Sequence, residues 1–196
     1  MLTRVPDTNK YQLGIEIYRL GLHTSLNLRT IVQPYLKRLV DEFGETANLV
    51  QHDNTHIIYV EKLESPYAMR VCSTIGQLLP FYCSGVGRSI MAFLPEHLIT
   101  AALESYDYRP YTERTITNAE DLKKQLVVIR ERGFAIDDEE FEKGTFCVGT
   151  PIFDSRRDPI AGISVSLPKI RVNDALLAKI ADRLLTFSRE ITKELY

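Results

Sequence analysis

The chain has 196 residues, of which 44% are hydrophobic and 26% charged, and its formal net charge at pH 7 is −2. A chain of this length buries a core without disulfides or metals, and three cysteines without CxxC spacing predict neither a disulfide framework nor a zinc ribbon. The slight acidity, with no run of Lys or Arg longer than two, argues against a nucleic-acid clamp in this segment. No apolar run reaches the ~20 residues of a membrane span, so a cytoplasmic location and no membrane partner are expected.

The first half of the chain shows helical periodicity followed by short strand signals. Apolar residues recur at i, i+3, i+4 and i+7 over residues 28–43, and Gly44 follows, so this stretch is predicted to be an amphipathic helix. Residues 45–50 and 55–63 predict two strands of a hairpin. Residues 68–72 are predicted to form a third strand.

The second half alternates helix and strand signals in the same way. Residues 95–103 and 118–133 are predicted helices; the first opens on a proline, and the second runs from Asn118 to Gly133. Strands are predicted over 145–153 and 160–167, and a last helix starts at Asn173. This order predicts a single α+β domain, an antiparallel sheet flanked by helices.

A polar, glycine-containing segment precedes one apolar run. Ser84, Gly85, Val86 and Gly87 lead into residues 90–94, which predicts a turn at the start of a helix. A helix start carries backbone N–H groups without intrahelical acceptors and favours negative charge, so the segment suits a small carboxylate. The alternative is that the two glycines only allow close packing of helix and strand.

Three further features carry candidate side chains. Along the strand 160–167, Ser164 and Ser166 alternate with apolar residues, so one face presents hydroxyls. Asp137 is a candidate ligand contact, whereas the acidic residues 138–140 are expected to form a solvated loop. Cys147 is expected to be a buried, inert thiol by default, with pocket lining as the alternative.

Several ordered motifs together resemble one known family. They are Ile75-Gly76 with Pro80, Ser84-Gly85-Val86-Gly87-Arg88, Arg132-Gly133 through Glu140, Gly144, Cys147, Pro151-Ile-Phe-Asp154 and Ile163-Ser-Val-Ser166. In this order they resemble the effector-binding domain of IclR-type bacterial transcription factors, from about Tyr11 to Tyr196.

The resemblance implies a domain organisation. Residues 1–22 would be a remnant of a DNA-binding wing followed by a linker helix (Ile15 to Leu22), and residues 23–196 a GAF-like effector-binding domain. The winged helix-turn-helix that reads DNA in such proteins is expected to be missing from this sequence. DNA would be reached only through that missing part, and the chain would assemble as a homodimer or tetramer.

The resemblance also implies a ligand site without catalytic residues or cofactor. Some domains of this family hold a metal, but no spacing of residues here predicts a metal site. The positions that correspond to the family's pocket for a small carboxylate are Val71, Leu79, Gly85, Val86, Asp137, Thr145, Cys147, Ser164 and Ser166. Two departures from the common pattern prevent the ligand's identity from being copied from relatives. Arg88 stands where Lys is more frequent, and Thr145-Phe146 replaces Leu-Arg.

The alternative function is a thiol redox enzyme on a GAF-like scaffold, of the sulfoxide reductase type. It is motivated by Cys72, Cys83 and Cys147, which the motifs place near one pocket. Such an enzyme needs a low-pKa thiolate and a resolving partner. The sensor is favoured because Arg70 is the only cation close in sequence to Cys72 or Cys147.

Overall fold

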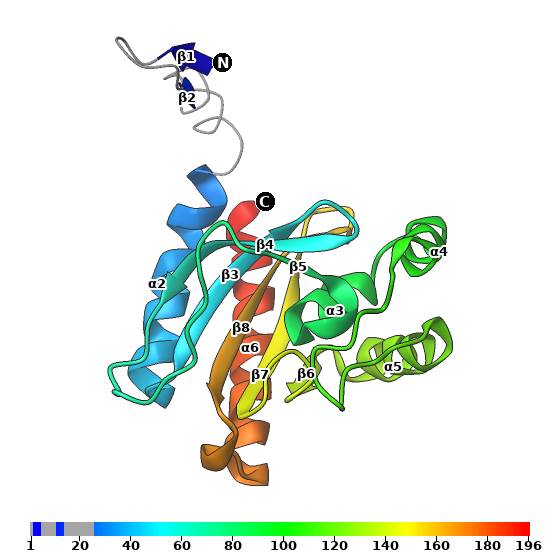
Figure 1. Cartoon of the computed structure of the whole chain (residues 1–196). Helices are drawn as coiled ribbons and strands as arrows, with labels where there is room; N and C mark the ends of the chain where they lie inside the picture. Colours follow the sequence, from blue (N-terminus) through cyan, green and yellow to red (C-terminus); the bar gives the residue numbers. More distant parts are fainter. Residues whose placement is uncertain (1, 5–10, 14–25) are drawn as a thin grey trace.

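The computed structural model describes residues 2–4, 11–13 and 26–196. Its centre is a six-stranded antiparallel sheet with the strand order β5-β4-β3-β8-β7-β6 (Figure 1). The predicted linker helix over residues 15–22 lies outside the described residues, and the division of the chain at residue 22 stays a prediction. Among the residues described, no helix combines the length and apolar character that crossing a bilayer requires.

The elements follow the predicted order of helices and strands. The strands of the central sheet are β3 (Thr46–His52), β4 (His56–Leu63), β5 (Leu78–Pro80), β6 (Ala135–Asp138), β7 (Thr145–Phe153) and β8 (Pro159–Pro168). Two further strands, β1 (Leu2–Arg4) and β2 (Tyr11–Leu13), pair only with each other. The described helices are α2 (Leu26–Phe43), α3 (Gly85–Met91), α4 (Glu96–Ser105), α5 (Ala119–Arg132) and α6 (Asp174–Leu195), with short 3-10 helices η1 (Phe81–Cys83) and η2 (Lys169–Arg171). The predicted α+β fold is confirmed.

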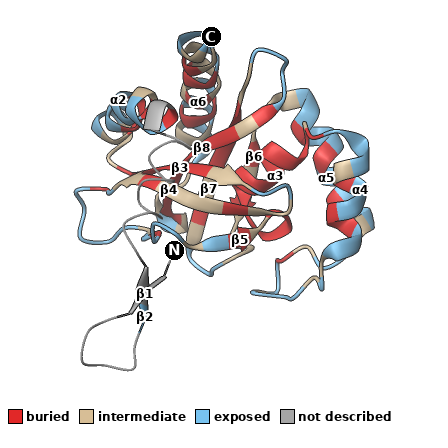
Figure 2. Ribbon diagram, turned by 90° about the horizontal axis from the view of Figure 1, so that it is seen from above, coloured by how far each residue is buried: buried red, intermediate tan, exposed pale blue. Residues whose placement is uncertain are grey.

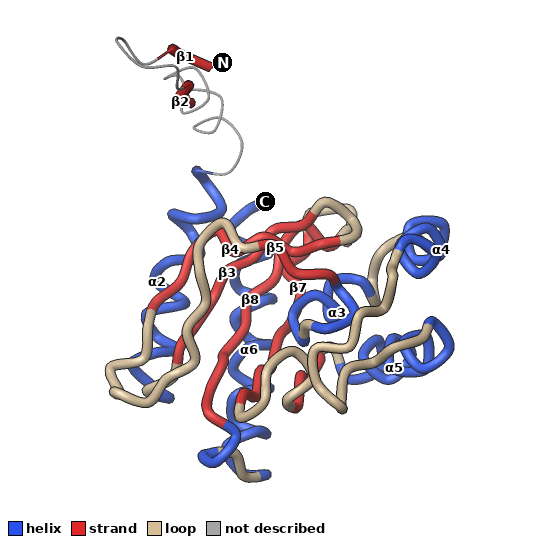
Figure 3. Tube along the Cα trace, in the orientation of Figure 1, coloured by secondary structure: helices blue, strands red, loops and turns tan. Residues whose placement is uncertain are grey.

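Helices cover both faces of the sheet, so the domain has two apolar cores (Figures 1 and 3). Helices α2 and α6 pack on one face, where Leu36 and Leu184 meet Val165 of β8. Helices α3, α4 and α5 form the other core, which includes Ile57 of β4 and Ile90 of α3. In Figure 2 the buried residues concentrate on the strands and on the inner sides of the helices. Because neighbouring residues of a strand face opposite sides, the long strands β3, β7 and β8 contribute to the packing on both faces, whereas the short β5 adds only Leu79 to the second core.

The helix ends are set by the capping residues that the sequence predicts. The Asn118 side chain accepts a hydrogen bond from the N–H of Asp121 at the start of α5. At the other end of α5, Gly133 adopts a left-handed conformation with φ of 80°. Asn173 caps α6 by accepting from the N–H of Leu176.

One strand prediction is wrong, and the two short strands β5 and β6 were not predicted. Residues 68–72 form no strand; there the carbonyl of Val71 accepts from the Thr46 hydroxyl, a side-chain contact in place of a strand ladder. The neighbour of β4 is instead β5, whose Leu79 pairs with Ile57. Strand β6 was not predicted, because four residues with two adjacent aspartates give a weak strand signal.

Candidate functional site

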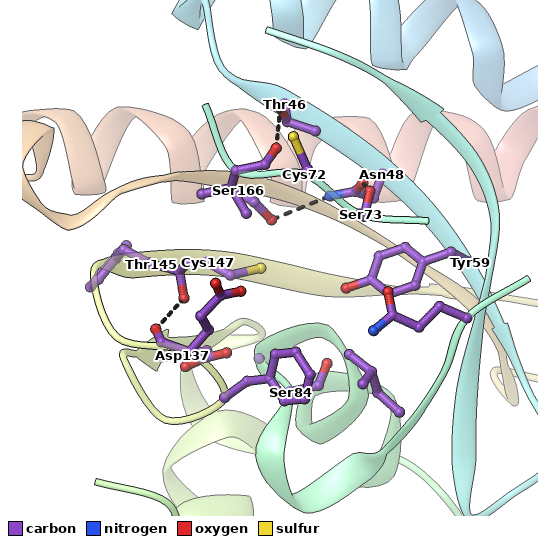
Figure 4. A pocket seen from close by; sticks show the side chains of 17 residues that line it. Thr46, Asn48, Tyr59, Cys72, Ser73, Ser84, Asp137, Thr145, Cys147 and Ser166 are labelled. Carbon is purple, nitrogen blue, oxygen red and sulfur yellow. Dashed lines mark hydrogen bonds between the residues drawn. The ribbon is translucent and has the colours of Figure 1, made fainter. Parts of the chain in front are cut away.

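A small cavity of about 100 Å³ lies where the sheet meets the start of α3, and we call it the polar cavity (Figure 4). It is lined by Thr46, Asn48, Tyr59, Val71, Cys72, Ser73, Gln77, Leu79, Ser84, Gly85, Asp137, Phe141, Glu142, Thr145, Phe146, Cys147 and Ser166. Seven of the nine positions predicted for the ligand site are among them: Val71, Leu79, Gly85, Asp137, Thr145, Cys147 and Ser166. Residues far apart in the sequence therefore meet at this cavity, and their role in binding a ligand stays a prediction.

The other two predicted positions, Val86 and Ser164, do not line the polar cavity. Val86 is 1% exposed and packs against Gly149 of β7, where an added Cβ would lie 2.5 Å from the Val86 Cα. Ser164 is also 1% exposed, and its hydroxyl accepts a hydrogen bond from the Asn48 amide at 3.4 Å. Val86 packs α3 against β7, and Ser164 links β8 to Asn48 of β3, so both support elements whose other residues line the cavity.

The glycine segment is the first turn of α3 and not a turn before it. Ser84 is the N-cap, and its hydroxyl accepts from the N–H of Gly87 at 3.2 Å. A Cβ on Gly85 would lie 3.0 Å from the backbone N of Asp137, and one on Gly87 would lie 2.9 Å from the Phe81 Cα. The glycines thus permit close packing, as the alternative proposed. The N–H of Gly85 also has no acceptor among the described residues.

A hydrogen-bonded chain of polar side chains lines the sheet side of the cavity. The Ser73 hydroxyl donates to Asn48 Oδ1 at 2.6 Å, and Asn48 Nδ2 donates to Ser166 Oγ at 3.2 Å (Figure 4). Ser166 accepts in this chain, and its own hydroxyl is hydrogen-bonded to the Cys147 thiol, so a ligand would take this proton in place of Cys147. The hydroxyl face predicted for β8 is confirmed, and Asn48 and Ser73 extend it.

Tyr59 is a lining residue that the sequence did not reveal. The register of β3 with β4 shifts between Leu49 and Val50, so that Leu49 opposes Glu61 while Val50 opposes Tyr59. This bulge turns Tyr59 to the cavity, whereas Glu61 faces Arg29 of α2 (2.5 Å). The Tyr59 hydroxyl has no hydrogen-bond partner in the described part of the chain, and burial raises its pKa. It is a neutral donor available to a ligand.

Asp137 brings a carboxyl group into the cavity from β6. It is 6% exposed, and its Oδ1 accepts from the N–H of Glu140 at 2.8 Å. Burial raises the pKa of this carboxyl to about 6, although the Arg88 guanidinium and the Glu140 N–H act in the opposite direction. Asp137 is therefore able to exchange a proton near neutral pH.

The acidic run after Asp137 is not a solvated loop. Arg88, 1% exposed, makes a bidentate ion pair with Glu140, with Nη2 2.7 Å from Oε1, and Nη2 also donates to the carbonyl of Ile136 at 2.5 Å. Asp138 pairs with Arg114 (2.7 Å) and with Lys169. Strand β6 and the residues after it place Glu140 next to Arg88 of α3 and Asp138 next to Lys169 of η2, so these acids form ion pairs. The planar guanidinium of Arg88 fits the bidentate geometry of its pair with Glu140.

The cysteines do not have the properties of a redox centre. Burial raises the pKa of the Cys83 thiol to about 12 and that of Cys147 to about 11. Both thiols are therefore protonated at neutral pH, whereas a redox enzyme needs a thiolate. Cys147 is half-buried and lines the polar cavity, which agrees with the pocket-lining alternative and not with the default of a buried thiol.

The lining favours a small guest held by hydrogen bonds. It contains two acids, Asp137 and Glu142, and no Lys, Arg or His. Sites for drug-sized molecules occupy roughly 300–1,000 Å³, so a cavity of about 100 Å³ takes a molecule of few atoms. Within the ranges that the structure describes, no group of three or more His, Cys, Asp or Glu is placed to hold a metal ion.

Comparisons with known proteins agree on one family. Residues 21–193 match the family model described as bacterial transcriptional regulator IclR C-terminal. The transcriptional repressor IclR of Escherichia coli (strain K12) is 32% identical over 193 residues, which span 96% of this chain and 70% of the repressor. The crystal structure of Thermotoga maritima IclR superimposes with a TM-score of 0.85 at 33% identity, covering 99% of this chain and 79% of that one. The C-terminal domain of E. coli KdgR gives a TM-score of 0.79 at 31% identity, covering 86% and 98%.

Proposed function

Because the chain belongs to the IclR family of bacterial transcriptional regulators, we propose that its polar cavity binds a small carboxylate metabolite as the effector. The matched segment is the ligand-sensing C-terminal domain of that family, and the named relatives are regulators, which points away from catalysis. No observation favours the redox enzyme. The observation that supports the proposal is a set of hydrogen-bond donors that reach one small cavity from separate elements.

Three donors can reach the carboxylate, and one of them, the Ser166 hydroxyl, would turn to it from the Cys147 thiol. The N–H of Gly85 comes from α3, the hydroxyl of Ser166 from β8 and the hydroxyl of Tyr59 from β4. Hydrogen bonds to a charged group contribute about 1.5–3 kcal/mol each. Two or three of them, less the cost of ordering the ligand, give an affinity between roughly millimolar and micromolar. That range suits the sensing of a metabolite.

Asp137 sets a chemical requirement on the ligand. A carboxylate next to an ionised Asp137 would be repelled, whereas a protonated Asp137 donates a hydrogen bond to it. The carboxyl also accepts a hydrogen bond from a hydroxyl on the ligand. We therefore infer that 2-hydroxy and 2-oxo acids of few carbons are the best candidates, the latter through their hydrated carbonyl.

The bound effector would act on DNA through the assembly. The cavity is walled by α3, β6 and the segment that joins β4 to β5, so occupancy changes how these parts pack. An effector regulates only if it favours one assembly state, typically by about 1–3 kcal/mol. We propose a homodimer or tetramer in which this bias reaches a DNA-binding N-terminal domain, which implies a cytoplasmic protein.

A thermal-shift titration tests the proposal. Lactate and pyruvate are expected to raise the melting temperature in a saturable way, because a ligand bound only to the folded state stabilises it by about 2.7 kcal/mol at 100 times Kd. Lactamide, which lacks the carboxylate, is the matched ligand control and should have little effect. Ser166→Ala should weaken binding about tenfold, and Ser155→Ala in the exposed turn after β7 should not. An equal response to lactamide, or unchanged binding in Ser166→Ala, would refute the carboxylate site.

A further inference from the structure

A second and larger cavity of about 590 Å³ lies where β7 ends, and we call it the cationic cavity. It is lined by Phe93, Gly133, Thr150, Phe153, Asp154, Arg157, Leu185, Ser188, Arg189, Thr192 and Lys193. None of these residues lines the polar cavity. Its volume falls in the roughly 300–1,000 Å³ range of small-molecule sites.

The floor of the cationic cavity is apolar. The rings of Phe93 and Phe153 meet edge to face, with centroids 5.2 Å apart and planes at 86°. Leu185 of α6 lies beside Gly133, where an added Cβ would be 2.9 Å from the leucine Cδ2. An aromatic ring of a ligand would find here the edge and face contacts that aromatic groups prefer.

The hydroxyls of the floor are already engaged within the protein. The Thr150 hydroxyl donates to the carbonyl of Gly133 at 3.0 Å, and the Ser188 hydroxyl donates to the carbonyl of Pro151 at 2.5 Å. Hydrogen bonding from these groups is therefore not what the cavity offers to a ligand. Thr192 Oγ1 accepts from the Phe153 N–H at 3.3 Å, so its hydroxyl proton can still be donated to a ligand. The charged side chains around the cavity supply the rest of its polar recognition.

Cations dominate this cavity. Arg157, Arg189 and Lys193 are exposed, and none forms an ion pair with any residue that the structure describes. The single acid, Asp154, has its Oδ1 engaged by the backbone N–H groups of Arg156 and Asp158, both at 2.8 Å. Helix ends nearby add only about half a negative charge each. Arg189 donates only to neutral groups of its own helix, the Leu185 carbonyl at 3.2 Å and the Thr186 hydroxyl at 3.4 Å. Within the described residues, no carboxylate therefore neutralises the positive charge of these three side chains.

We propose that the cationic cavity is a second ligand site, for an aromatic compound that carries one acid group. Its ring would lie against Phe93, Phe153 and Leu185, and its acid group would face Arg157, Arg189 and Lys193. A ligand of this size is too large for the polar cavity of about 100 Å³. The two sites thus select by different chemistry, and the second does not depend on the effector proposed for the first.

The dye 1-anilinonaphthalene-8-sulfonate is a direct probe, because it is an aromatic monoanion that fluoresces in apolar surroundings. Titrated into the folded full chain, it should bind saturably with one site per chain. The double variant Arg189→Glu/Lys193→Glu should weaken binding at least tenfold. The matched control Lys123→Glu/Lys179→Glu makes the same change of charge at exposed lysines that do not line the cavity and should leave binding within twofold.

Two further measurements complete the test. The neutral analogue N-phenyl-1-naphthylamine should bind at least tenfold more weakly than the sulfonate, and lactate should not displace the dye. The proposal is overturned if both charge-reversal pairs weaken the dye equally, because that result would indicate a general effect of net charge. Equal binding of the neutral analogue, or stoichiometric displacement by lactate, would overturn it as well.

Discussion

The two cavities differ in almost every physical respect, although β7 reaches both. Thr145 and Cys147 near the start of the strand line the polar cavity, and Thr150 and Phe153 toward its end line the cationic one. The first is small, rich in neutral donors and without a cation, whereas the second is large, apolar and bordered by unpaired cations. Binding of an anion in the polar cavity would depend on well-directed hydrogen bonds. Binding in the cationic cavity would depend on Coulomb attraction and on the apolar area that the ligand buries. The same strand therefore supports two kinds of recognition.

Breaking the buried ion pair behind the polar cavity should have the largest effect. Arg88→Met leaves Glu140 and the carbonyls of Tyr82 and Ile136 without their donor. Removal of one partner of a buried pair costs about 3–5 kcal/mol, so the free energy of unfolding should fall by that amount. Urea denaturation measures it.

The control for this variant is an exposed pair. Lys124 pairs with Glu120 at 2.8 Å on the outer face of α5, so Lys124→Met should leave the urea midpoint nearly unchanged. Equal losses in the two variants would mean that Arg88 contributes nothing through its burial. The ion pair between Arg88 and Glu140 would then not be what stabilises the side of the polar cavity formed by α3 and β6.

The contact between α3 and β7 should give the next largest effect. In Gly149→Ala the new Cβ would lie 2.5 Å from the Val86 Cα, which is backbone and cannot rotate away. Overpacking of this kind costs about 1–3 kcal/mol. Urea denaturation of Gly149→Ala and of Gly149→Ala/Val86→Ala should show that trimming the valine gives no rescue. Full rescue would place the clash on the side chain and contradict the close approach of the two backbones.

Much of this architecture was predictable because it depends on local signals. The ends of α5 follow from Asn118 and Gly133, and the hydroxyl face of β8 follows from the alternation of Ser164 and Ser166 with apolar residues. Seven of the 17 residues that line the polar cavity followed from the motif resemblance. What these cases share is that a residue's neighbours in sequence decide its role.

The failures involve residues whose role depends on distant partners. Tyr59 turns to the cavity because of a bulge that exists only in the pairing of β3 with β4. Glu140 forms an ion pair with Arg88 and is not solvated, but the two residues are 52 positions apart in the sequence, so the pair forms only in the folded domain. Val86 supports the cavity from behind because Gly149 and Gly162 leave space for it. No local sequence pattern predicts such contacts, since they form only when the sheet assembles.

The pH dependence of effector binding should sharpen the contrast between the cavities. Since the pKa of Asp137 is about 6, raising the pH above this value ionises a group that faces the bound carboxylate. Lactate affinity should fall by up to about tenfold per pH unit between pH 6 and 8. Asp137→Asn, which still accepts from the Glu140 N–H, should make the profile flat in calorimetric titrations. A wild-type affinity independent of pH would contradict proton-linked binding.

The same carboxyl should influence stability without a ligand. Its pKa is raised from 3.8 in the unfolded reference to about 6, so the folded chain holds a proton that the unfolded chain releases. The associated stability is fully present below pH 3.8 and is lost as the pH rises through 6. The difference in unfolding free energy between wild type and Asp137→Asn should therefore change by about 2–3 kcal/mol across this window. The same difference in unfolding free energy between wild type and variant at pH 4 and at pH 7, measured by urea denaturation, would contradict the shift.

Salt should give the smallest effect and separates the cavities most directly. Exposed charges are screened over a Debye length of about 10 Å at 0.1 M salt and about 3 Å at 1 M. Binding of the naphthalene sulfonate near Arg157, Arg189 and Lys193 should therefore weaken several-fold between 0.05 and 0.5 M NaCl. Lactate binding in the polar cavity should change by less than twofold, because its donors are neutral and largely buried. If both ligands respond to salt equally, the two sites do not differ in how they attract an anion, and the division between hydrogen-bonded and Coulombic recognition fails.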